Sequence, residues 1–72
     1  MRPYLPLPSN PILLPAHTGS LARRAQEEIE AHRPKAAAAT IGRLEVAVLE
    51  MFRAGLDAEQ FENRAIRLRN SL

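Results

Sequence analysis

The chain has 72 residues, of which 46% are hydrophobic, 4% aromatic and 25% charged, and it contains no cysteine. A chain of this length forms one small domain at most, and it buries only about 60% of the surface that its unfolded form exposes. Small folds usually need disulfides, a metal or self-association, and the lack of cysteine excludes the first. Ten basic and eight acidic residues give a net charge of +2, too small to indicate nucleic acid or an acidic membrane.

The same numbers exclude several classes of protein. A few turns of helix on each side seldom build a pocket that keeps water from converging polar groups, so we expect no enzyme, no cofactor and no small-molecule substrate. The longest apolar stretch, 36–51, is interrupted by polar and charged residues and does not predict a membrane span. The N-terminal prolines prevent the helical core of a secretory signal. We therefore expect a cytoplasmic protein.

Residues 1–16 form a proline-rich segment that precedes a helical domain over 17–72. Its five prolines remove backbone donors and favour extended geometry, so we expect an extended, polyproline II-like arm. The arm is also apolar, and we expect it to cover its own helices or a second subunit. The alternative is a ligand for an SH3-like groove, because the arm contains two bare PxxP patterns. The candidate binding residues of the arm are Tyr4, Leu7, Ile12 and Leu14.

The first predicted helix runs over about 20–32. Thr18 or Ser20 provides a cap, and Leu21, Ala25 and Ile29 recur on one side. This apolar stripe is thin, so the helix is either an exposed flank or half of a self-associating pair. Pro34 breaks or kinks the helix and begins the next one at its first position, where the missing N–H costs little.

The second predicted helix, over about 34–54, carries the strongest pattern. Its apolar residues recur at spacings of three and four, as in the seam of a packed or coiled pair. Val46 lies away from the seam, so either the helix is contacted on two sides or this valine is exposed. Ala38 and Gly42 permit a close backbone approach, with a merely tolerated glycine as the alternative. The candidate self-association and protein-binding residues here are Ile41, Leu44, Val48, Met51 and Phe52.

The turn after the second helix is the most specific local signal. Gly55 suits a left-handed C-terminal cap, after which Leu56 contacts Met51. Asp57 caps the next helix, Gln60 completes a capping box, and Leu56 meets Phe61 as a hydrophobic staple. Overlapping stop and start signals predict a tight αα-hairpin whose last helix covers about 58–70.

Few residues carry recognisable chemistry. Glu28 and His32 share a helix face, but a zinc site needs three or four donors, so we expect a solvated face and no metal. Gln60, Arg64 and Arg67 fall on one outward face of the last helix, where arginines can meet phosphates, and the segment has the outline of a helix-turn-helix. Glu59 and Glu62 stand at its first turn and would repel a phosphate backbone.

The sequence therefore predicts an all-α fold: a small helical bundle built on a C-terminal αα-hairpin, preceded by the arm, that we expect to be dimeric. Its apolar surface exceeds what one copy can bury. We expect a non-catalytic protein-binding module, a regulator, inhibitor or adaptor that forms a homodimer and binds a larger, unidentified protein. The alternative is a small DNA- or RNA-binding regulator that uses the arginine-rich last helix. No resemblance to a particular family enters these expectations.

Overall fold

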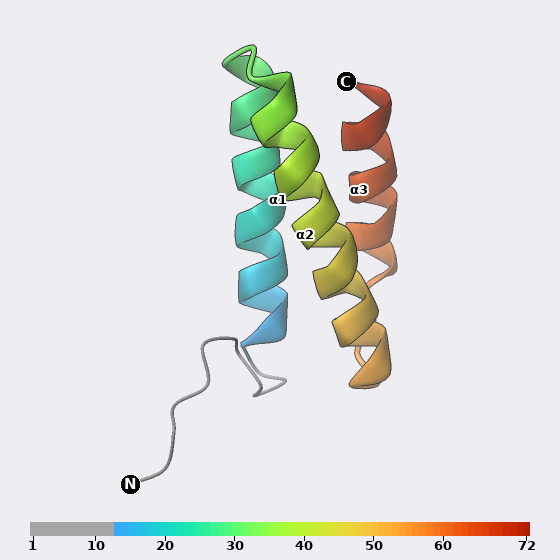
Figure 1. The fold of residues 1–72 in the computed structure, drawn as a ribbon. Helices are drawn as coiled ribbons and strands as arrows, with labels where there is room; N and C mark the ends of the chain where they lie inside the picture. Colours follow the sequence, from blue (N-terminus) through green and yellow to red (C-terminus); the bar gives the residue numbers. More distant parts are fainter. Residues whose placement is uncertain (1–12) are drawn as a thin grey trace, which may run out of the picture.

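The computed structural model describes residues 13–72, which form three helices and no strand. Helix α1 spans Leu14–Glu30, α2 spans Pro34–Arg53 and α3 spans Glu59–Asn70, and successive helices run in opposite directions (Figure 1). The predicted all-α class is confirmed. The expectations about the arm at Tyr4, Leu7 and Ile12 lie outside the described residues.

Helix α1 begins six residues earlier than the sequence pattern predicts, so the extended geometry expected through residue 16 is wrong for its last three residues. Pro15 occupies the first turn, where its missing N–H needs no partner and its fixed φ suits the helix. Thr18 is not the cap: it is buried inside the helix, where its hydroxyl donates to the Leu14 carbonyl at 2.7 Å. The N-cap is Leu13, which has no side-chain capping bond.

Helix α1 ends in a Schellman turn built without glycine. His32 has a φ of +58°, its N–H donates to Ile29 and the Arg33 N–H donates to the Glu28 carbonyl at 2.9 Å. A left-handed conformation costs a residue with a Cβ roughly 1 kcal/mol. Pro34 then begins α2 in its first turn, so it separates two helices and kinks neither.

Helix α2 ends in the same motif, here with the predicted glycine. Gly55 has a φ of +79°, its N–H donates to Phe52, and the Leu56 N–H donates to the Met51 carbonyl at 2.9 Å. The Asp57 carboxylate then accepts the Glu59 N–H at 3.2 Å. The N-cap of α3 is Ala58, however, and it has no side-chain capping bond, so the predicted cap at Asp57 and its capping box with Gln60 are wrong. The chain therefore reverses within a few residues, as the overlapping signals predict.

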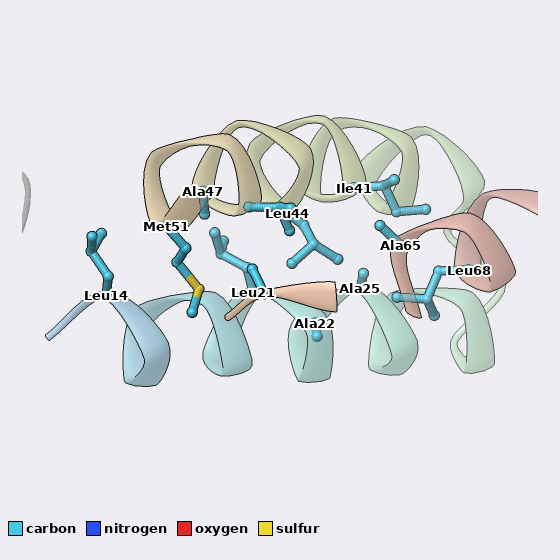
Figure 2. Close-up of a cluster of buried hydrophobic side chains, with 12 residues drawn as sticks. Leu14, Leu21, Ala22, Ala25, Ile41, Leu44, Ala47, Met51, Ala65 and Leu68 are labelled. Carbon is cyan, nitrogen blue, oxygen red and sulfur yellow. The ribbon is translucent and has the colours of Figure 1, made fainter. Parts of the chain in front are cut away.

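The core lies where all three helices meet (Figure 2). Helix α2 projects Ile41 and Leu44 toward α1, and the alanines Ala22 and Ala25 on α1 are small enough for the two helices to pack closely. Helix α3 adds Ala65 and Leu68. The thin α1 stripe is thus covered within the chain, because Thr18 and Ala22 widen it on the buried side.

Two polar contacts fix the helices in register. The Thr40 hydroxyl on α2 donates to the Glu28 carboxylate on α1 at 2.6 Å, and Thr40 is only 5% exposed. On the surface, Arg69 of α3 donates two hydrogen bonds, of 2.9 and 3.0 Å, to the carboxylate of Glu45 on α2. The bond to Glu45, together with its charge, raises the pKa of the Arg69 guanidinium.

The Glu45–Arg69 pair also decides how α2 and α3 cross. It lies eight residues before the end of α2 and ten residues after the start of α3. At about 1.5 Å per residue, the two helices are therefore still adjacent more than 10 Å from the turn that joins them. This is the geometry of an antiparallel hairpin and not of a widely crossed helix-turn-helix.

The two Schellman turns predict opposite responses to substitution. We expect His32→Gly to stabilise the fold by about 0.5–1 kcal/mol, because glycine adopts a positive φ without steric cost. Gly55→Ala at the equivalent position should destabilise it by about 1 kcal/mol. Urea denaturation followed by circular dichroism measures both. Equal effects of the two substitutions would contradict the turn geometry.

Candidate protein-binding surface

Most of the residues that the sequence nominates for binding on α2 are internal. Ile41, Leu44, Val48 and Met51 are at most 4% exposed, packed against α1 and α3 of the same chain. Leu14, nominated as part of the arm, lies in the first turn of α1 and joins the same core. The seam is therefore a packing surface, as its spacing predicts, but the surface that covers it belongs to this chain.

The other face of the α1/α2 pair is open. All residues that line the hollow there come from α1, α2 and Ala54 at the end of α2, and its volume is about 1210 Å³. We call this hollow the α1/α2 groove. Val46, which the seam leaves aside, is 58% exposed and lies in it. The apolar residues and glycine that line the groove are Leu14, Leu21, Ala39, Gly42, Val46, Ala47 and Ala54.

Gly42 has no side chain, so the space above it in the groove is open. A Cβ at this position would meet no other atom within 4 Å, so no part of residues 13–72 approaches the glycine closely. At Gly42, the predicted close approach is therefore not made by α1 or α3. A Cβ can be added at Gly42 without displacing anything in the described part of the chain.

The polar residues of the groove are mainly cationic. Arg24 on α1 and Arg43 and Arg53 on α2 line it, together with His17 and Ser20, against a single carboxylate, Glu50. Two of the arginines have intrahelical partners: Arg24 lies 3.6 Å from Glu28, and Arg53 lies 3.8 Å from Glu50. Arg43 takes part in no ion pair within residues 13–72.

A second apolar surface lies beside the contact between α2 and α3. Leu49 follows Glu45 by one turn of α2, and Ile66 precedes Arg69 by about one turn of α3, so the register set by the ion pair places Leu49 and Ile66 at the same level of the two antiparallel helices. Phe52 continues the row on α2, and the three residues are 58%, 54% and 43% exposed, in the order Leu49, Ile66 and Phe52. We call them the α2/α3 strip. Of the nominated α2 residues, Phe52 alone stays on the surface.

The nucleic-acid candidates are all exposed on α3, as the sequence predicts. Arg64 and Arg67 line a small depression with Gln26 of α1, whose amide donates to the Glu30 carboxylate at 3.0 Å. Gln60 is exposed one turn before Arg64. The two acidic residues of the first turn, Glu59 and Glu62, lie on the same helix and are also exposed, so they oppose the approach of a phosphate backbone to α3.

The described residues show no cluster of three metal-ligating side chains. Glu28, the partner proposed for His32 by spacing, instead accepts the Thr40 hydroxyl and pairs with Arg24. None of the helices in residues 13–72 has an apolar stretch long enough to cross a bilayer.

Comparisons of the chain with protein-family models, with curated proteins and with solved structures found no match. The function is therefore inferred from the groove and the strip. The sequence signals for the groove were Val46 outside the seam and Gly42. Ala38, which the prediction paired with Gly42, does not line the groove, whereas its neighbour Ala39 does.

The division between core and surface on α2 predicts unequal effects of truncation. Leu44→Ala should lower the free energy of unfolding by about 2–5 kcal/mol, because it leaves a cavity between α1 and α2. Val46→Ala, only two residues away, should change it by less than about 0.5 kcal/mol. Urea denaturation compares the two variants. A large loss of stability for Val46→Ala would show that Val46 is covered within the chain.

Proposed function

We propose that this protein is a non-catalytic protein-binding module, a small regulator, inhibitor or adaptor that self-associates and binds a larger protein. The observation that carries the proposal is the α1/α2 groove, to which α3 contributes no lining residue. A hollow with an aliphatic floor and a charged rim is a form of surface on which amphipathic helices dock.

Exposed apolar surface on a small domain supports the same reading. Isolated apolar residues on a surface need no explanation, but Val46 lies among other apolar groove residues. Leu49, Phe52 and Ile66 are all exposed, and the register of the Glu45–Arg69 pair places them at similar levels of α2 and α3. The polar groups of the groove are chiefly arginines, which suit contacts with a protein partner. We assign the binding of the larger protein to the groove.

We assign self-association to the α2/α3 strip. Phe52 is the largest side chain of the strip and the one nominated residue of α2 that remains exposed. A two-fold symmetric dimer pairs the same patch on both subunits, so a short row of three apolar residues can cover its own copy. The small core of a 72-residue chain gains stability from such burial.

Binding of DNA or RNA through Gln60, Arg64 and Arg67 is the competing proposal, supported by the exposure of the two arginines on one face of α3. It requires that the protein shift the electrophoretic mobility of a random-sequence duplex. This binding should weaken steeply as salt rises and should be abolished by the double substitution Arg64→Glu and Arg67→Glu. An affinity that stays flat between low and moderate salt contradicts it. The net charge of +2 and the exposed Glu59 and Glu62 in the first turn of α3 favour the protein-binding proposal.

A display library of random 16-residue peptides tests protein binding by the groove. We expect the full chain to select peptides that bind the wild type and Gly42→Ala but lose at least about tenfold in affinity for Gly42→Leu, whose side chain projects into the middle of the groove. Leucine is a better helix former than glycine and its Cβ meets open space, so Gly42→Leu should be at least as stable as the wild type.

Calorimetry or fluorescence anisotropy with the selected peptides measures the affinities, and urea denaturation verifies the fold of both variants. Selected peptides that bind Gly42→Leu as well as the wild type, or a library that yields no binder, would contradict the groove as a binding site.

Light scattering tests self-association. We expect a mass near twice 8.0 kDa at micromolar concentration for the wild type, and a shift toward one chain for Phe52→Glu, because a buried carboxylate opposes burial of the strip. Lys35→Glu, at an exposed site outside both surfaces, is the control. A wild-type monomer with a cooperative thermal transition would exclude the dimer.

A further inference from the structure

The α1/α2 groove also indicates the chemistry of what it binds. We infer that its occupant is an acidic amphipathic helix supplied by another protein, with its apolar face on the groove floor and its carboxylates against the arginines. This inference rests on the proposed function, since it names the partner of the groove that the proposed function assigns to protein binding.

The dimensions of the groove fit a helix of a few turns. Its lining on α2 extends from Ala39 to Ala54, and at about 1.5 Å per residue this stretch is about 22 Å long, or about four turns. Helices pack with axes about 8–10 Å apart, and the shortest separations need small residues at the contact. Ala39, Gly42 and Ala47 supply them along the floor.

The charges of the groove select the sign of the partner. Three arginines and one glutamate line it, so the rim is cationic although the whole chain carries only +2. Arg43 is central, because it lies one residue from Gly42 and is in no ion pair of residues 13–72. The sequence of residues 1–12 contains no Asp or Glu that could pair with it. A carboxylate from outside the chain is therefore its natural partner.

The chain's own segments complement the groove less well. Residues 1–12 carry Arg2 as their one charged side chain, so their charge has the same sign as the rim. A second copy offers the acidic stretch Glu27–Glu28 of α1, but Glu28 is already bonded to Thr40 and paired with Arg24. Helix α3 of a second copy offers Glu59 and Glu62, but Arg64, Arg67 and Arg69 follow on the same short helix and would meet the cationic rim. A helix from a different protein remains the best match in charge.

The inference predicts the composition of the selected peptides. Their apolar residues should recur at i, i+3 or i+4, and i+7, and Asp and Glu should outnumber Lys and Arg on the flanks of that stripe. Binding should weaken as salt rises, since the arginines are exposed to solvent. We expect Arg43→Glu to lower the affinity of the selected peptides at least about tenfold, because it places like charges together.

Lys35→Glu is the matched control for Arg43→Glu. It changes the net charge by the same amount, lies on the same helix and does not line the groove. We expect it to change the affinity by less than about twofold, because a distant exposed charge is screened. The charge-swapped peptides, in which every Asp and Glu is replaced by Lys, should bind Arg43→Glu better than they bind the wild type.

The outcomes separate the inference from the proposed function. Selected peptides that lose affinity for Gly42→Leu but are neutral or basic would contradict the inference that the partner is acidic. They would still support protein binding by the groove. Equal losses for Arg43→Glu and Lys35→Glu would do the same. A wild-type dimer that Gly42→Leu converts to a monomer would show that a second copy occupies the groove. If no peptide depends on the groove, the inference and the assignment of protein binding to the groove fail together.

Discussion

The structure depends on a single helix that packs in two directions. Helix α2 supplies Ile41, Leu44 and Met51, which are among the largest fully buried side chains, and both α1 and α3 lie against it. Its buried residues cover adjoining faces, so its third face is left without a neighbour in residues 13–72. The core and the α1/α2 groove thus have one cause: two helices cannot surround a third.

Closing this small core requires short connections, and both turns use the same hydrogen-bond pattern. The chain after α2 has the glycine that this pattern favours, whereas the chain after α1 places His32 in the left-handed region. The proline that follows, Pro34, offsets part of this cost because its φ is already that of a helix start. Thr40, six residues after Pro34, then bonds to Glu28, whose own carbonyl accepts the Arg33 N–H in the first turn. The left-handed His32 therefore lies between two helices that are bonded to each other close to the turn.

The sequence was most informative where the signal is local. Gly55 and Leu56 determine the end of α2 through backbone geometry within a few residues, and the structure reproduces it, although the N-cap of α3 is Ala58 and not Asp57. The start of α1 was mispredicted because five prolines suggest extended chain, although Pro15 in a first turn is compatible with a helix. The left-handed His32 has no sequence signal of its own, since a positive φ is ordinarily read from glycine or asparagine.

The candidate site was harder to predict for a different reason. Spacing identifies which side of a helix is covered, but not which chain supplies the cover, so the seam of α2 read equally as core and as dimer interface. The structure assigns Ile41, Leu44, Val48 and Met51 to the core. The groove residues lie on several turns of two helices and become neighbours only after α1 folds onto α2.

The two helical glycines show how stability and binding are linked in this molecule. Each lowers helix stability by roughly 0.5–1 kcal/mol relative to alanine. Gly19 faces α3, and a Cβ there would touch the ring of Phe61 at 3.8 Å, so its neighbour belongs to the same chain. Gly42 faces only the groove, and nothing in residues 13–72 uses the space above it. The cost at Gly42 therefore has no compensation within the described fold, whereas a helix seated in the groove would approach closely at this point and use that space.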